Sequence, residues 1–373
     1  MSRPTSSNSL TITGTEELSK LLSIPETVKV VILSGDKDSE ITIEFPELPS
    51  HVDSLTIHRA RILGKPQVKE GLVMLDLGDC TYEHSLSHWI FPSSLEHFKI
   101  KDPIEAGVAG VVDLRSVTAP EISVDNIGSG NLRLYGNLPL IFPEGLESLN
   151  LDGGFGFEEK FVTFVPPGTP LERRTDDEGN GLVLIALPHY LRTMTLRRID
   201  KVIPGELSLT ADIEELTIMG ESQFRNIHEI FPRLDTLTLA GLTFHGRGYM
   251  SEPEEFAYRG NLKHLIMRRV NVSSRGTILF SIQGAETVTI TDAYKGILYQ
   301  PMDGPKTLIV KDSESFPSFE SLANLETLVT RGTRNTLELP FAPMLKALDL
   351  DAPAYSNKVR VSNLDEYRAT WEA

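Results

Sequence analysis

The stretch that decides the fold is Leu325–Thr330, which reads LETLVT. Its pattern is an apolar residue, two variable residues, an apolar residue, one variable residue and a final position that is apolar in most copies. The pattern recurs at Leu345-Leu348-Leu350, Leu234-Leu237-Leu239, Leu146-Leu149-Leu151, Leu72-Leu75-Leu77 and Leu262-Leu265-Met267. A short strand repeated at near-constant spacing predicts a solenoid, because each unit is too small to bury its own apolar face.

Further copies of the pattern fill most of the chain, at intervals of about 20 to 24 residues. They stand at Val28-Val31-Leu33, Val52-Leu55-Ile57, Leu95-Phe98-Ile100, Leu191-Met194-Leu196, Ile213-Leu216-Ile218, Ala285-Val288-Ile290 and Pro305-Leu308-Val310. One copy, the blurred repeat, matches the pattern only loosely: Ala119-Ile122-Val124 fits best, and Leu132-Leu134 is the alternative. The outward residues of that copy are therefore left unassigned.

A proline stands three residues before the first apolar position of four copies, in the strings LPSHV, FPSSL, FPEGL and LPHYL (Pro49, Pro92, Pro143 and Pro188). With the strand pattern, this resembles leucine-rich repeat proteins over nearly the whole chain. The prolines resemble the short Leu-Pro repeats of Gram-negative secreted effectors and, second, FNIP-type repeats. The resemblance implies an α/β repeat solenoid, a horseshoe with a concave parallel sheet and short helices or turns on its convex side. The chain departs from it after each strand, where the usual Asn or Cys occurs only as Cys80.

A right-handed β-helix is the competing architecture, since its coils have a similar length. We favour the horseshoe because two segments between strands look helical or turn-like. They are residues 222–231, SQFRNIHEIF, and residues 251–260, SEPEEFAYRG.

The repeats predict three parts: a flexible leader at 1–13, a repeat domain at 14–351 and a capping segment at 352–373. Capping-box spacing at Thr13 and Glu16 predicts an N-terminal helix, and Asn363 and Glu366 predict a C-terminal one. Residues 152–186 form an insertion, predicted as an antiparallel hairpin or one irregular repeat. Residues 242–261 form an overlong aromatic loop, whose side chains either bind a partner or pack beneath the loop.

The composition limits the function classes. The 373 residues carry a formal net charge of -16, which argues against nonspecific nucleic-acid binding. No apolar run approaches the ~18 residues of a membrane-spanning helix. One cysteine permits no intramolecular disulfide, and the Ser/Thr-rich start lacks the apolar region of a Sec signal. We therefore expect a cytoplasmic protein, or one secreted without a Sec signal into a host cytoplasm.

Enzyme motifs are not found in the sequence. There is no Gly-x-Ser-x-Gly elbow, no P-loop and no His-Glu-x-x-His helix. Cys80, His84 and His88 have a spacing that could suit a metal. We interpret Cys80 instead as a small buried residue and the two histidines as surface residues. No catalytic residue, metal site or cofactor is predicted.

The concave sheet is the predicted binding surface, because the variable residues of each strand point away from the core. Ile266, Ile309 and Val329 lie beside cations that can grip carboxylates, an arrangement typical of an interface hot spot. The predicted site residues are Arg268, Lys311, Arg331, Ile266, Ile309, Val329, Arg197 and His264. They predict a protein partner with an acidic patch.

The function predicted from these features is a noncatalytic protein–protein interaction scaffold, with a secreted bacterial effector in a host cell as its setting. One alternative is the substrate-recognition subunit of a ubiquitin-ligase-type complex, which requires an adaptor-binding helix that neither end of the sequence shows. The other is an enzyme with its site in the insertion at 152–186, where Glu158, Asp176, Asp177 and Glu178 lack a nucleophile or metal ligand set. The oligomeric state is left open.

Overall fold

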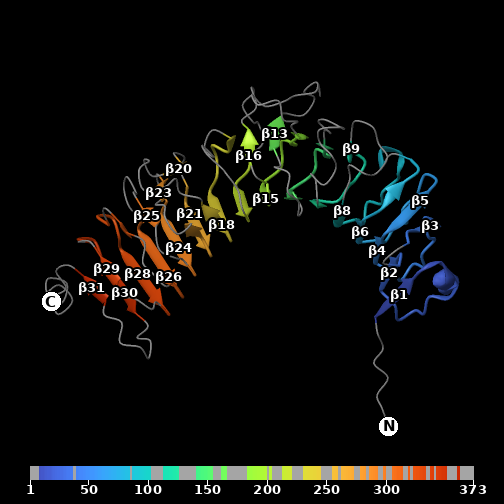
Figure 1. Cartoon of the computed structure of the whole chain (residues 1–373), viewed down its shortest axis with the longest axis horizontal. Coiled ribbons are helices and arrows are strands. Elements are labelled where there is room, and N and C mark those ends of the chain that lie inside the picture. The colour runs from blue at the N-terminus through green and yellow to red at the C-terminus, as the bar shows by residue number, and fades with distance from the viewer. Residues whose placement is uncertain are drawn as a thin grey trace, which may run out of the picture. The chain divides into compact units, whose positions relative to one another are not determined.

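The computed structural model describes residues 8–36, 39–84, 86–101, 112–125, 140–153, 161–165, 183–199, 201–203, 212–220, 230–244, 254–258, 262–272, 278–282, 285–292, 297–299, 305–313, 318–319, 322–332, 337–339, 342–350 and 359–361. They belong to two compact units, Met1–Asp212 and Ile213–Ala373, whereas the sequence predicts one repeat domain without a break there. Each unit is built as a parallel β-solenoid (Figure 1). The repeat solenoid predicted from LETLVT and its copies is confirmed.

The long sheet of the first unit contains one strand from each turn of the solenoid. Neighbouring strands pair in parallel, and equivalent repeat positions face each other, as in Leu55↔Leu75 and Leu149↔Met194. In spatial order the strands are β1 (Ser9–Thr13), β2 (Val30–Ser34), β4 (Ser54–His58), β6 (Met74–Gly78), β8 (His97–Lys101), β10 (Glu121–Asp125), β12 (Ser148–Asp152) and β15 (Thr193–Arg197).

The long sheet of the second unit repeats this arrangement in the same register, for example Leu237↔Leu265. In spatial order its strands are β17 (Glu215–Met219), β18 (Thr236–Ala240), β21 (His264–Arg268), β24 (Thr287–Thr291), β26 (Thr307–Lys311), β28 (Thr327–Arg331) and β30 (Ala347–Leu350).

Further parallel strands of two to five residues form the second layer of each unit. In the first unit one such sheet has the order β3 (Ile41–Glu44), β5 (Ala60–Leu63) and β7 (Thr81–Tyr82). The other has the order β16 (Lys201–Ile203), β13 (Phe161–Val165), β14 (Val183–Ala186), β11 (Leu140–Ile141) and β9 (Val112–Asp113). The second unit has three such sheets. One pairs β19 (Thr243–Phe244) with β22 (Asn271–Val272), and another pairs β29 (Leu337–Leu339) with β31 (Val359–Val361). The third has the order β20 (Glu254–Tyr258), β23 (Ile278–Ile282), β25 (Ile297–Tyr299) and β27 (Ser318–Phe319).

The core lies between the two layers and is filled by the residues of the repeat pattern. In β18, Leu237 and Leu239 are fully buried, while the residues on either side of them are only half-buried. Leu234, the first apolar position, lies just before the strand and is buried as well. Because burying a leucine side chain stabilises a fold by about 1.5–3 kcal/mol, the stacked turns hold one another together.

A left-handed corner follows many strands of the long sheets. Non-glycine residues there have φ near +50°, at Arg59, Asp79, Arg198, Arg269, Asp292 and Asp312. The corner N–H donates to a strand carbonyl of the next turn, as from Arg59 to Gly78 at 3.0 Å. The following residue is buried, as Ala60, Ile199 and Val270 are. Backbone bonds between turns thus hold this corner, and the side chain after it can be apolar where leucine-rich repeats have Asn.

The prolines before the strands belong to tight turns. The N–H three residues after the proline donates to the proline carbonyl, at 3.1 Å from Val52 to Pro49 and 3.2 Å from Leu146 to Pro143. Pro92 and Pro188 accept the same bond. A proline at the start of such a turn fixes φ without removing a donor that the turn needs.

The two segments expected to be helical or turn-like on the convex side differ: Ile230, near the end of residues 222–231, is helical, whereas residues 254–258 are not. Residues 251–260 were expected to be helical or turn-like, but Glu254–Tyr258 is strand β20, which pairs with β23. Residues 222–229 lie outside the described residues. The helical elements with described bounds are the 3₁₀ helices η1 (Thr15–Ser23) and η2 (Leu86–His88). No helix among the described residues has the length and hydropathy needed to cross a bilayer.

Tyr258 supports the structural interpretation of the aromatic loop at 242–261. Its side chain is fully buried, and its hydroxyl accepts a hydrogen bond from the Leu234 N–H at 3.2 Å and contacts the Phe231 carbonyl at 3.3 Å. Burial raises the pKa of the Tyr258 hydroxyl to about 12. Tyr258 therefore ties β20 to the preceding turn; His245 and Tyr249 lie outside the described residues.

The antiparallel hairpin predicted for residues 152–186 is wrong. Its two apolar runs form β13 and β14, which pair in parallel from Val162↔Val183 to Val165↔Ala186. β13 also pairs with β16, and β14 pairs with β11, so both strands are interior members of the second layer. Residues 166–182, which join them, lie outside the described residues.

The N-terminal boundary also differs from the prediction. The leader proposed for residues 1–13 contains β1, which pairs with β2, so Thr13 ends a strand and is not a helix N-cap. Helix η1 does form, but none of its residues is buried, and Leu22 is 91 % exposed. The N-terminal helix expected from the sequence therefore forms without a fully buried apolar stripe. The helix predicted at 363–371 lies outside the described residues.

Candidate interaction surface

The surface that can meet a partner is the open face of the long sheets, by which we mean the first, third and fifth residues of their strands. Their exposure alternates with that of the buried second and fourth residues, as in the pattern of β18. Because all strands pair in register, the open face carries three straight rows of side chains across each sheet. The amino-acid types in these rows decide what the face can bind.

The fold brings seven of the eight predicted site residues onto the open face of the second unit, on β21, β26 and β28. Ile309 pairs with Val329 and Lys311 pairs with Arg331 in the register of β26 and β28. Strand β24 separates β26 from β21, which carries His264, Ile266 and Arg268. Arg197 belongs to β15 of the first unit.

The cations of this predicted site are not equally available. Arg331 forms an ion pair with Asp349, with 2.5 Å between Nη2 and Oδ2. Arg197 Nε lies 3.8 Å from Asp152 Oδ2. Arg268 and Lys311 are exposed, and neither forms an ion pair with any residue that the structure describes. They are therefore the two predicted cations that can pair with a partner without first losing an internal carboxylate.

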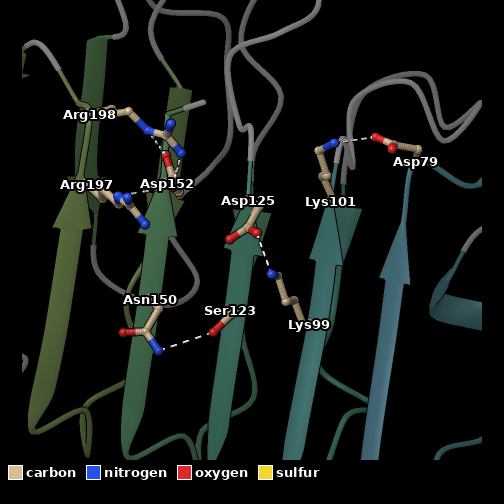
Figure 2. A network of polar contacts seen from close by, with 9 residues as sticks. All are labelled: Asp79, Lys99, Lys101, Ser123, Asp125, Asn150, Asp152, Arg197 and Arg198. Atoms are coloured by element: carbon tan, nitrogen blue, oxygen red, sulfur yellow. Dashed lines mark hydrogen bonds and ion pairs between the residues drawn. The ribbon is translucent and has the colours of Figure 1, made fainter. Parts of the chain in front are cut away.

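A polar network that the sequence did not predict crosses the open face of the first unit. Figure 2 shows its pairs along neighbouring strands, including Lys99 with Asp125 at 2.8 Å and Lys101 with Asp79 at 2.6 Å. Asn150 donates to Ser123 Oγ at 3.2 Å. His97 Nδ1 lies 3.0 Å from Glu121. In this network the cations are paired with carboxylates of neighbouring strands or, for Lys101, of the corner after β6.

The blurred repeat explains why this network was missed. Glu121, Ser123 and Asp125 are the outward residues of β10, the strand whose register the sequence left open. The register of β10 with β8 places Glu121 beside His97 and Asp125 beside Lys101, and Lys99 reaches Asp125 diagonally. Choosing Ile122 and Val124 as core positions would have placed all three polar residues on the open face.

Asp152 anchors the end of this network. The residue is 8 % exposed and accepts a hydrogen bond from Arg198 Nε at 2.7 Å on Oδ1. Arg198 Nη2 contacts the other carboxylate oxygen. Arg198 occupies the left-handed corner after β15, so the bidentate pair joins β12 to that corner. Two N–H donors of one guanidinium thus meet one carboxylate, the bidentate geometry of strong charge-assisted hydrogen bonds.

Asp76 is a carboxylate of this face whose charged form is disfavoured by burial. Its Oδ1 is buried and has no hydrogen-bond partner among the described residues. Burial raises the pKa of the Asp76 carboxyl, and the Coulombic effects of Lys99 and His58 oppose this only partly. The pKa of Lys99 is raised chiefly by its hydrogen bond to Asp125. Lys99 is thus engaged by Asp125, and Asp76 lacks a close partner.

The raised pKa of Asp76 gives a prediction about pH. A carboxyl whose pKa is higher in the folded than in the unfolded protein stabilises the folded state at pH values below the unfolded-state pKa, which is near 4. This stabilisation is lost as the pH rises through the folded-state pKa. Asp76→Asn removes the charge and should raise the urea midpoint of unfolding at pH 7 relative to wild type. The difference should shrink as pH falls towards about 4. Asp53→Asn, just before β4, is the control, and an unchanged or lower midpoint of Asp76→Asn at pH 7 would contradict the burial effect.

Cys80 is buried and structural. Its thiol contacts the carbonyl oxygens of Ile57 at 3.3 Å and Gly78 at 3.4 Å. Burial raises the pKa of the Cys80 thiol to about 12, so the reactive thiolate is disfavoured. His84 and His88 lie with ring centroids 6.5 Å apart. In the described part of the chain, no three His, Cys, Asp or Glu residues are placed to hold a metal ion.

Comparison with known proteins gives no match to a protein-family model, a curated protein or a solved structure.

Proposed function

We propose that the chain is a noncatalytic scaffold that binds a partner protein on the open face of its second unit. The observation that carries this proposal is the combination of Arg268 and Lys311, exposed and unpaired among the described residues, with a neighbouring aliphatic row. Ile266, Ile309 and Val329 form that row and are half-buried in the sheet. Aliphatic groups supply desolvated contact, and adjacent cations select a partner with carboxylates.

The contrast between the two units supports this choice of surface. On the first unit, Lys99 and Lys101 already have carboxylates within 2.8 Å and 2.6 Å, so a partner would have to displace them. On the second unit, Arg268 and Lys311 carry no such cost. A partner's carboxylate therefore gains more from the second unit than from the first, since only the surplus over broken contacts appears as affinity.

The test is affinity capture from a lysate with the intact chain and a triple charge reversal, Arg268→Glu, Lys311→Glu and Arg331→Glu. We expect the wild type to retain its partner and the triple variant to bind at least about tenfold more weakly, as for loss of a hot spot. The control reverses Lys263, Lys306 and Lys346, which precede β21, β26 and β30 and are also exposed, but which form ion pairs with Asp235, Glu286 and Glu326. Partner binding that survives the first triple reversal, or falls equally in both, would refute this site.

We further propose that the architecture is a variant of the leucine-rich repeat, related to the Leu-Pro type. The strand pattern of LETLVT and the proline turns, such as Leu146 to Pro143 at 3.2 Å, support this relationship. The extended second layer, including β20, is the feature that would distinguish the variant. Export without a Sec signal into a host cytoplasm remains our proposed setting, and a translocation reporter fused to the first residues would test it.

A further inference from the structure

We propose that the partner presents an acidic amphipathic α-helix, which lies across strands β21, β24, β26 and β28 of the open face. This inference rests on the proposed function, because it names the shape and charge of whatever Arg268 and Lys311 bind. It follows from the spacing of two rows of side chains that the register of the sheet fixes.

The aliphatic row has two different spacings. Ile309 and Val329 are direct partners in register, whereas Thr289 lies between Ile266 and Ile309. Neighbouring strands lie about 4.8 Å apart, so Ile309 and Val329 are about 5 Å apart along the row and Ile266 and Ile309 are about 10 Å apart. A partner that uses all three anchors must offer apolar groups at about 5 Å and about 10 Å.

An α-helix offers these spacings and an extended peptide does not. With a rise of about 1.5 Å per residue, side chains on one helix face recur about every 5 Å after three or four residues and about every 10.5 Å after seven. Side chains on one side of an extended peptide recur about every 6.7 Å. A peptide running along the strands would meet one or two strands and would miss the row.

The row of cations beside the aliphatic row indicates that the partner's contacting groups are negatively charged. Arg268 and Lys311 are separated by Thr291 in the same register, so they also lie about 10 Å apart along their row. This row runs beside the aliphatic row, two residues further along the strands. Glutamates seven residues apart on one flank of the helix would therefore face Arg268 and Lys311 together. Arg331 already has Asp349 as a partner, so it contributes less.

Purely anionic ligands fit this surface less well. Heparin would satisfy Arg268 and Lys311, but it has no apolar stripe to cover Ile309 and Val329. The rows of the open face thus favour a helix that has one apolar stripe and one acidic flank.

The probe is a fluorescent peptide of about 21 residues, three heptads, with leucines on one face and glutamates on one flank. A side-chain lactam on its far face holds it helical, because short isolated helices are marginal in water. The comparison ligands are the same peptide with lysine for each glutamate, an acidic version broken by prolines, and heparin. Fluorescence anisotropy with the intact chain measures each affinity.

The expected result is that the acidic helix binds the wild type and loses at least about tenfold in affinity to Arg268→Glu with Lys311→Glu. Lys263→Glu with Lys306→Glu makes the same charge change at the other ends of β21 and β26 and should leave affinity unchanged. Equal binding of the proline-broken peptide overturns the helix. If the lysine peptide binds equally well, the proposed charge complementarity is wrong. If heparin binds through Arg268 and Lys311 while the acidic helix does not bind, the proposal of a helical peptide partner is wrong.

This experiment separates the two proposals. If the acidic helix fails to bind while a captured partner still requires Arg268 and Lys311, the helix proposal is wrong and the proposed function stands. If neither the helix nor a captured protein depends on these residues, the open face of the second unit is not the binding surface and both proposals fall.

Discussion

Replacing Gly35 by alanine is expected to destabilise the first turns of the solenoid by about 3 kcal/mol, the upper part of the range for overpacked sites. Gly35 is buried at the corner after β2. An added Cβ would lie 2.5 Å from the Arg59 carbonyl oxygen and 2.6 Å from that of Ser39. Both are backbone atoms that cannot swing aside, and the Gly35 N–H also donates to the His58 carbonyl at 3.0 Å. The methyl group can therefore be placed only by separating neighbouring turns.

Hydrogen exchange followed by mass spectrometry, together with urea unfolding, measures this effect. Because a solenoid is held by contacts between neighbouring turns, a fault near one end should open that end first. We expect Gly35→Ala to lose amide protection over residues 28–63 while β12 and β15 keep theirs. Gly145→Ala is the control, since nothing lies within 4 Å of its added Cβ. Wild-type protection in Gly35→Ala would show that the corner can open at little cost.

Replacing Asp152 by asparagine is expected to cost about 3 kcal/mol, because it removes the negative charge that Nε and Nη2 of the partly buried Arg198 guanidinium contact. The side chain of Arg198 is only 23 % exposed, and the new amide would point N–H donors at another donor. Buried ion pairs that lose one member typically cost 3–5 kcal/mol, and the remaining exposure of Arg198 places this site at about the lower limit.

The matched control for Asp152→Asn is Asp79→Asn. Asp79 pairs with Lys101 at 2.6 Å, but both side chains are more than one third exposed, so water can replace the lost contact. Asparagine also tolerates the left-handed backbone of Asp79, whose φ is 51°. Urea unfolding at pH 7 should show a clear loss for Asp152→Asn and little change for Asp79→Asn. Equal midpoints for the two variants would mean that the burial of Asp152 does not matter.

The predicted strands were correct where the repeat pattern was clear. In β18 and β28 the apolar positions read from the sequence are the buried ones, because a strand with one covered face must alternate in polarity. The second layer was not predicted correctly. Residues 254–258 of SEPEEFAYRG resemble a helix locally, yet they form β20 by pairing with β23, and pairing with the next turn overrides local propensity.

The relative positions of the predicted site residues followed in part from the same pattern. The register of the repeats placed Ile309 beside Val329 and Lys311 beside Arg331, so these neighbours followed from the pattern. Which cations remain unpaired did not follow, because Arg331 and Asp349 sit in different rows and meet diagonally. The same holds for Lys99 and Asp125 on the first unit.

The sequence by itself determined that short strands stack in parallel and which residues of the long-sheet strands enter the core wherever the repeat pattern was clear. That information is local and repeats in every turn, so one clear copy such as LETLVT defines the others. Only the tertiary structure decided that β13 and β14 run parallel, that Thr13 ends a strand, and which charges are already neutralised. These features depend on contacts between turns that are about 20 or more residues apart, which no single repeat contains.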